Sequence, residues 1–98
     1  MSPKATLWRE YREEYSDGTF VELIIWLVPF SEEKPHGLKY RLHFGTDSGT
    51  CILRYDNEKG KGDHRHIGTK EEPYLFISPE KLLQDFLNDV AKYRKELS

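Results

Sequence analysis

Residues 19–28 read T-F-V-E-L-I-I-W-L-V and form the clearest β-strand in the chain. β-Branched and aromatic residues dominate this stretch, as they do in strands generally. The even-numbered side chains share one face and the odd-numbered ones the other, and both faces are apolar apart from Glu22. A strand that is apolar on both faces is typically central and covered on both sides. We therefore expect a central strand that ends at Pro29.

The preceding stretch, T-L-W-R-E-Y-R-E-E-Y at residues 6–15, allows two interpretations. As a helix, it would align Leu7, Tyr11 and Tyr15 on one face. As a strand, it would lead into the turn signal S-D-G at residues 16–18. The turn and the strand that follows it favour the second interpretation, so residues 6–28 are predicted to form a β-hairpin.

Further strands are predicted downstream. Residues 38–44 alternate strictly between apolar and polar, which is typical of a half-buried antiparallel strand. Residues 51–56 read as a fourth strand and residues 74–77 as a short fifth one, after a solvated, extended segment at 70–73. In the fourth strand Cys51 shares a face with apolar residues, so it is expected to be a buried filler.

The C-terminal part of the chain predicts an amphipathic helix. Ser78 is a favourable N-cap and Pro79 suits the first helical position. The residues expected on the packed side recur at helical spacing: Leu83, Phe86, Leu87, Val90, Ala91, Tyr93, Arg94 and Leu97. Short connections between successive strands favour a meander. The predicted fold class is α+β, with an antiparallel β-meander of about four to five strands and one C-terminal α-helix packed on the sheet. It forms a single domain over residues 1–98.

Composition narrows the function classes. The 98 residues are 37% hydrophobic and 33% charged, as in a folded globular protein, with a formal net charge of -2. This charge provides no overall attraction to nucleic acid, so any such binding needs a local basic patch. A lone cysteine permits no internal disulfide. The N-terminus carries no apolar signal segment, and the longest apolar run is too short for a membrane span. We expect a cytoplasmic protein without membrane attachment.

The stretch Y-D-N-E-K-G-K-G-D-H-R-H-I-G at residues 55–68 is the candidate functional loop. Its glycines loosen the backbone and its polar residues cannot build a core. If residues 63–67 are extended, His64 and His66 point the same way and Arg65 the opposite way. The two histidines and a cation could cleave RNA without a metal, one histidine taking the 2′-hydroxyl proton and the other protonating the leaving oxygen. Arg65 is the catalytic cation candidate, and Arg54 or Lys61 could serve instead. The alternative is a pair of solvated surface histidines.

Neighbouring residues complete the candidate site. Asp56 is a catalytic candidate because it could orient a histidine, although an Asp-Asn pair also commonly caps a strand end. The substrate-binding candidates are Arg54, Asn57, Lys59 and Lys61. A metal site is the second interpretation, since Asp56, Asp63, His64 and His66 suit Mn, Mg or Zn. The standard H-x-x-x-H and C-x-x-C spacings are missing, so we predict neither a metal nor another cofactor.

The remaining candidates are weaker. Trp8 and Trp26 are expected in the core, and no role is assigned to His36 or His43. The outward row Lys39, Arg41 and His43 reads as a solvated face. It is also the best basic track for a nucleic acid backbone or an acidic partner.

The order of these motifs resembles the TumE-type toxin family of prokaryotic toxin–antitoxin systems. The specific block is R-Y-D-N-E-K-G-K-G-D-H-R-H at residues 54–66, flanked by D-G-T-F-V-E-L-I-I-W at 17–26, L-K-Y-R-L at 38–42, E-E-P-Y at 71–74 and L-L-Q-D-F-L-N-D-V at 82–90. The positions that match the motif are Tyr55, Asp56, Asn57, Gly62, His64, Arg65 and His66. The resemblance implies a toxin role and a small helix-turn-helix antitoxin as protein partner.

Together, the resemblance and the residues predict a toxin that attacks RNA through the His-Arg-His loop. The alternative is a non-enzymatic module that binds protein or nucleic acid with the same loop or with the sheet face. An edge strand is also available to pair two copies into a homodimer, with Trp8 or Tyr11 at the junction.

Overall fold

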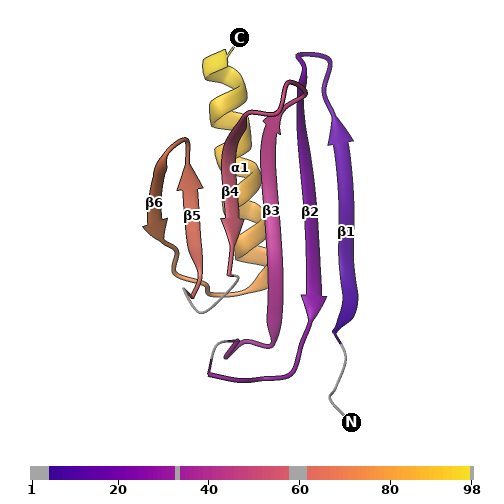
Figure 1. Cartoon of the computed structure of the whole chain (residues 1–98), viewed down its shortest axis with the longest axis vertical. Coiled ribbons are helices and arrows are strands. Elements are labelled where there is room, and N and C mark those ends of the chain that lie inside the picture. Colours follow the sequence, from indigo (N-terminus) through magenta and orange to yellow (C-terminus); the bar gives the residue numbers. More distant parts are fainter. Residues whose placement is uncertain (1–4, 33, 58–61, 98) are drawn as a thin grey trace.

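The computed structural model describes residues 5–32, 34–57 and 62–97. They form one six-stranded antiparallel sheet in which every strand pairs with its neighbours in sequence, followed by a single helix (Figure 1). The strands are β1 (Thr6–Glu14), β2 (Thr19–Leu27), β3 (Leu38–Thr46), β4 (Cys51–Asp56), β5 (His64–Ile67) and β6 (Lys70–Pro73), and the helix is α1 (Pro79–Leu97). The predicted α+β meander with a C-terminal helix is confirmed, with slightly more strands than expected.

The first hairpin forms as the turn signal predicted, and the helical interpretation of residues 6–15 is wrong. The Tyr15 amide donates to the Thr19 carbonyl at 2.8 Å, which closes the turn between β1 and β2. Gly18 has a φ of 85°, a backbone conformation that residues with a Cβ rarely adopt. The Asp17 carboxylate accepts from the Thr19 amide at 3.0 Å and fixes the start of β2.

The core lies between α1 and one face of the sheet. It is built from the buried apolar side chains of β2, β3 and β4 and from Leu82, Phe86 and Val90 of α1. These three helix positions recur every four residues, which places them on one side of the helix. The Lys81 amide donates to the Ser78 hydroxyl at 3.1 Å, so Ser78 is the N-cap that the sequence predicted. In Figure 1 the helix runs behind the sheet and leaves the front face uncovered.

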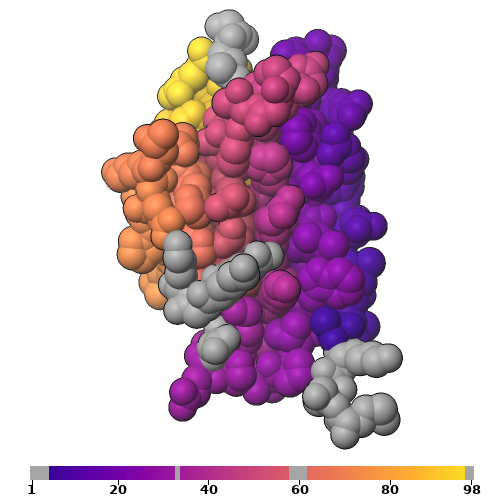
Figure 2. All heavy atoms as spheres, in the orientation of Figure 1, coloured from indigo at the N-terminus to yellow at the C-terminus, as the bar shows by residue number. Residues whose placement is uncertain are grey.

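Strand β2 is therefore not covered on both sides, and that expectation was wrong. Val21, Leu23 and Ile25 are buried beneath the helix, whereas Ile24 and Trp26 are only half-buried on the uncovered face, which Figure 2 shows. The expectation failed because a single helix can cover only one face of the sheet. Trp8 is also half-buried, so neither tryptophan belongs to the fully buried core.

The last two strands differ from the expected one. Residues 64–67 and 70–73 pair as β5 and β6, whereas residues 74–77 form no strand. Those residues instead support the core from outside the sheet. Tyr74 donates a hydrogen bond to Asp85 of α1 at 2.6 Å, and the Phe76 ring stacks on His36. Pairing with the existing sheet edge outweighs the weak strand propensity of H-R-H-I and K-E-E-P.

Cys51 is exposed and not buried, which corrects its expected role as a core filler. The pairing of β3 with β4 shifts by one residue between Phe44 and Gly45, and Cys51 lies opposite Gly45 at the end of the strand. A register irregularity of this kind breaks simple alternation. Within the described residues, no helix is long and apolar enough to cross a membrane.

Candidate functional site

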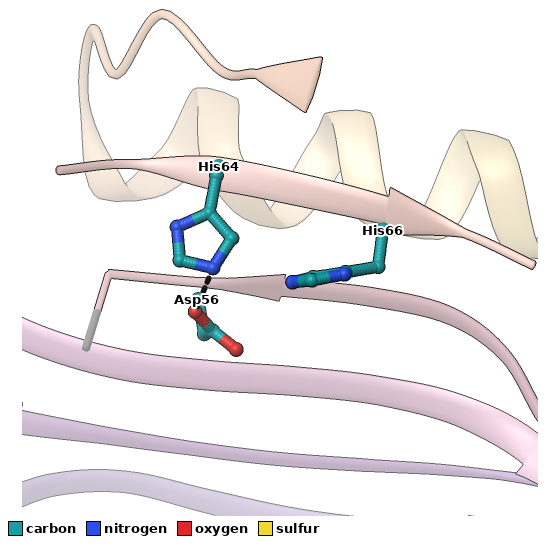
Figure 3. A group of neighbouring side chains, drawn as sticks. All are labelled: Asp56, His64 and His66. Atoms are coloured by element: carbon teal, nitrogen blue, oxygen red, sulfur yellow. Dashed lines mark ion pairs between the residues drawn. The ribbon is translucent and has the colours of Figure 1, made fainter. Parts of the chain in front are cut away.

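Strands β4 and β5 bring the candidate residues together on the uncovered face. Their pairing sets His64 opposite Asp56 and His66 opposite Arg54. Side chains that face each other across an antiparallel pair lie on the same side of the sheet. In Figure 3 both imidazoles project from β5 toward β4, where Asp56 meets His64. The predicted same-side orientation of the two histidines is confirmed.

His64 is held between two hydrogen-bond acceptors. Its Nε2 lies 2.6 Å from the Asp56 carboxylate, and its Nδ1 lies 3.0 Å from the Gly62 carbonyl oxygen. A carbonyl oxygen only accepts, so Nδ1 carries a proton. The short contact at Nε2 needs a second proton between imidazole and carboxylate. The side chains of His64 and Asp56 are each 7% exposed, so the proton they share is largely shielded from solvent.

Arg54 connects that buried pair to His66. Its Nε lies 2.9 Å from Asp56, and its Nη2 lies 3.1 Å from the Nε2 of His66. A guanidinium only donates, so the Nε2 of His66 bears a lone pair and the imidazole is neutral. Burial and the nearby Arg54 charge lower the pKa of His66, while Glu71, 3.5 Å from its Nε2, acts in the opposite direction. At neutral pH, His66 is thus a free base.

The two imidazoles have different hydrogen-bond partners although their ring centroids are only 5.0 Å apart. One carries a proton that it can give, and the other has a lone pair that can take one. Arg54 bridges Asp56 and His66 as the cation of the cluster. A base, an acid and a cation within one cluster are the groups required by general acid–base catalysis at a phosphate.

The same cluster also has a donor set for a metal. Ligand atoms of Asp56, His64 and His66 all lie within 4.8 Å of one another. Two imidazole nitrogens and a carboxylate oxygen suit Zn²⁺ and related divalent ions. Asp63, which the sequence had added to this set, lies elsewhere. Its carboxylate accepts from the Tyr40 hydroxyl at 2.6 Å and pairs with His36 at 3.1 Å.

Arg65 lies on the helix face, opposite the histidines, as strand alternation predicted. Its guanidinium pairs with Glu72 of β6 and, at 3.1 Å, with Asp89 of α1. It also lies over the Tyr55 ring, 5.8 Å from the centroid. The structure thus separates Arg65 from the cluster, and Arg54 is the cation that accompanies the histidines.

Asn57 is 1% exposed and its amide is fully engaged by the backbone of β3. It accepts from the Tyr40 amide at 3.0 Å and donates to the Leu38 carbonyl at 2.7 Å. These two bonds extend the pairing of β3 and β4 beyond the end of β4. The remaining two candidates, Lys59 and Lys61, lie outside the described residues.

Glu71 belongs to the site and was missed by the sequence analysis. It lies opposite His66 because β5 and β6 form a hairpin through Gly68. The sequence signal for this hairpin turn was Gly68, which has a φ of 59° in the structure. Treated as a two-residue turn, the Gly68–Thr69 step would have placed Glu71 across from His66.

The comparison with known families identifies one family over nearly the whole chain. The family model described as Toxin TumE matches residues 4–94, which is nearly the whole chain. The chain belongs to the TumE toxin family. Neither the curated proteins nor the solved structures contain a significant match to it. The matched residues include the whole sheet and most of the helix. They also include the four cluster residues, Arg54, Asp56, His64 and His66.

Proposed function

We propose that this TumE-family toxin cleaves RNA by metal-independent acid–base catalysis. The observation that supports the proposal best is the pairing of a neutral His66 with a protonated His64–Asp56 pair, with Arg54 between them. Adjacent titratable groups held in different protonation states are typical of acid–base sites.

In the proposed reaction, the Nε2 of His66 takes the proton of a ribose 2′-hydroxyl. The 2′-oxygen attacks the adjacent phosphorus, and a new 2′-O–P bond forms. The bond from phosphorus to the 5′-oxygen then breaks, and that oxygen receives the proton held by His64 and Asp56. The products are a 2′,3′-cyclic phosphate and a free 5′-hydroxyl, and no water or metal is consumed.

Arg54 has two functions in this scheme. In the free protein its Nη2 donates to the lone pair of His66. An arriving phosphate attracts the guanidinium, because an arginine–phosphate contact is charge-assisted at both ends. Moving toward the phosphate frees the His66 lone pair and places positive charge against the developing phosphorane. Substrate binding and activation of the base are thereby coupled.

We also propose a protein antitoxin of the helix-turn-helix type as the partner that silences the toxin, and the cytoplasm as its site of action. A toxin that acts on cellular RNA needs an inhibitor in the same compartment. The uncovered sheet face is the surface such an inhibitor would have to block, because Arg54 and His66 are the more accessible members of the cluster, with side chains 38% and 20% exposed.

The test is expression in a bacterial host with growth and total RNA integrity as readouts. His66→Gln should abolish growth arrest and RNA cleavage while the protein stays folded. His36→Gln is the matched control, because His36 also pairs with a carboxylate, Asp63, but is separate from the cluster. Purified protein should cleave RNA in the presence of EDTA and leave cyclic phosphate ends.

Other outcomes identify the alternatives. Cleavage that EDTA abolishes and Mn²⁺ or Zn²⁺ restores would replace the acid–base scheme with a metal centre on the same donors. Growth arrest with intact RNA would retain the toxin and reject the nuclease. Absence of both effects, with soluble folded protein, would favour a non-enzymatic binding module.

A further inference from the structure

A groove of about 630 Å³ crosses the uncovered face of the sheet beside the catalytic cluster. Its lining comes from the first three strands and includes Ile24 and Trp26. Both side chains are half-buried. They belong to β2, and Figure 2 shows the sheet from the face that the helix leaves uncovered. The volume lies within the range of about 300–1,000 Å³ that is usual for ligand sites.

The groove borders the cluster at strand β3. Pairing sets Arg41, which lines the groove, directly opposite Asp56. Directly opposite residues in an antiparallel pair have Cβ atoms about 5 Å apart. A ligand in the groove can therefore extend to Arg54 and His66 without leaving the sheet face.

The two basic residues on the β3 side are available to a ligand. Lys39 and Arg41 are exposed, and neither forms an ion pair or side-chain hydrogen bond with any residue that the structure describes. Arg12 on the opposite side is neutralised by Glu14 at 3.2 Å and by Glu22 at 2.8 Å. The groove thus has an apolar floor, a positive side toward the cluster and a negative far side.

We propose that this groove holds single-stranded RNA next to the cleaved phosphate. The inference rests on the proposed function, because it supplies the binding site for that reaction's substrate. A base stacks on Trp26, and the backbone follows Lys39 and Arg41 toward Arg54. Aromatic side chains on a sheet bind unpaired bases well, since every base has a face to stack.

Charge and shape favour this ligand over a duplex. Glu10 lines the far side of the groove and places a negative charge there, so phosphates are directed to the β3 side alone. A duplex keeps its bases stacked internally and cannot present one to Trp26. The acceptable substrate is therefore an unpaired segment, and paired RNA is excluded from the groove.

The experiment uses a Trp8→Phe background, in which Trp26 is the sole tryptophan, and a fully 2′-O-methylated single strand. The methyl group blocks attack by the 2′-oxygen, so binding is measured without cleavage. Binding should quench Trp26 fluorescence. A second measurement by anisotropy of a labelled strand follows variants that lack Trp26.

Trp26→Leu should weaken the Kd by about tenfold to a hundredfold, the usual loss of one base–aromatic stack. Trp26→Leu keeps an apolar side chain in place, and circular dichroism checks that it folds. Changing Lys39 and Arg41 together to Gln should reduce the salt slope of log K by about 1.4, which corresponds to two phosphate contacts on a single strand. Lys92→Gln on α1 is the control and should leave the Kd and the slope unchanged.

His66→Gln separates the two proposals, since it should abolish cleavage but retain binding of the methylated strand. Failure of the wild type to cleave any RNA, with tight Trp26-dependent binding, would reject the nuclease and keep the groove. Equal affinity for duplex and single strand, or a Kd insensitive to Trp26→Leu, would overturn the groove assignment. Trp26 fluorescence that responds to a protein antitoxin but not to RNA would also overturn the groove assignment.

Discussion

Replacing Asn57 by Ala should destabilise the fold, because this side chain satisfies two buried backbone groups of β3. Its carbonyl oxygen accepts from the Tyr40 amide, and its amide donates to the Leu38 carbonyl. Asn57 is 1% exposed, Tyr40 1% and Leu38 4%, so bulk water does not reach these groups. Truncation leaves one donor and one acceptor without partners inside the protein.

The magnitude follows from the number of groups left unpaired. A buried polar group without a partner costs about 1–3 kcal/mol. Two such groups lower the free energy of unfolding by roughly 2–4 kcal/mol, because a water that enters the small cavity can pair with them and reduce the largest losses. For a domain of this size, each kcal/mol lowers Tm by about 4–8 °C, so the expected decrease is roughly 10–25 °C.

Thermal and urea unfolding followed by circular dichroism would measure the effect. Asn57→Asp should cost at least as much at neutral pH, because it keeps the acceptor for Tyr40 but puts a buried carboxylate oxygen where the donor to the Leu38 carbonyl was. The exposed Asn88 of α1 is the matched control, and Asn88→Ala should leave stability within about 0.5 kcal/mol of the wild type. An Asn57→Ala protein as stable as the Asn88→Ala protein would refute the stabilising role of the two Asn57 hydrogen bonds to β3. Asn57 would then again be a substrate-binding candidate.

Three further predictions concern stability. A Cβ on Gly45 would lie 2.6 Å from the Thr50 carbonyl oxygen, so Gly45→Ala should lower the free energy of unfolding by about 1–3 kcal/mol in urea titrations. Burial lowers the pKa of His43 and His66 below the ordinary value of 6.5. The unfolded chain then binds protons first, so urea titrations should show stability falling as the pH drops below 6.5, with a smaller slope in His43→Gln. Arg65→Met, which removes ion pairs that tie β5 to α1 and β6, should cost about 1–2 kcal/mol in the same assay because its side chain is 30% exposed. An unchanged midpoint in Arg65→Met would show that these pairs contribute nothing measurable.

Local patterns were sufficient for much of the fold. The β-branched and aromatic residues of 19–28 and the S-D-G turn predicted the first hairpin, and Ser78 with Pro79 predicted the start of α1. The same patterns did not reveal β6, whose sequence K-E-E-P is poor in strand-forming residues. Strand β6 forms because the edge of β5 offers backbone hydrogen-bond partners. A contribution from the tertiary structure cannot be recognised in a short stretch of sequence.

The helix shows the same limit at the level of single residues. Heptad-like spacing marked Leu83 and Leu87 for the packed side, yet Leu87 is 47% exposed and Leu82 is fully buried. Neighbouring leucines satisfy a helical period almost equally well. The choice between them depends on where the sheet lies, and α1 is set there by Tyr55, Tyr74 and Arg65, which bond to its acidic residues.

For the candidate site, the period of the strand was more informative than the composition of the loop. Two-residue alternation separates H-R-H into a pair of histidines on one face and an arginine on the other. It indicated that Arg54 or Lys61 could replace Arg65 but could not choose between them, because that choice depends on the register of β4 against β5. Asn57 was equally hidden, since its partners are backbone groups of β3 that are 17 and 19 residues away.

The division of the motif between two faces explains how one short strand can serve both the fold and the site. On the helix side, Arg65 anchors β5 to α1 and to β6. On the uncovered side, the imidazoles of His64 and His66 are thereby held against β4. There His64 contacts Asp56, and His66 contacts Arg54. A mobile loop could not hold two imidazoles in different protonation states only 5.0 Å apart, because each would exchange partners with water. The ion pairs on the helix side and the proton transfer that we propose on the uncovered side both depend on this alternation, so weakening the ion pairs should also disturb the cluster.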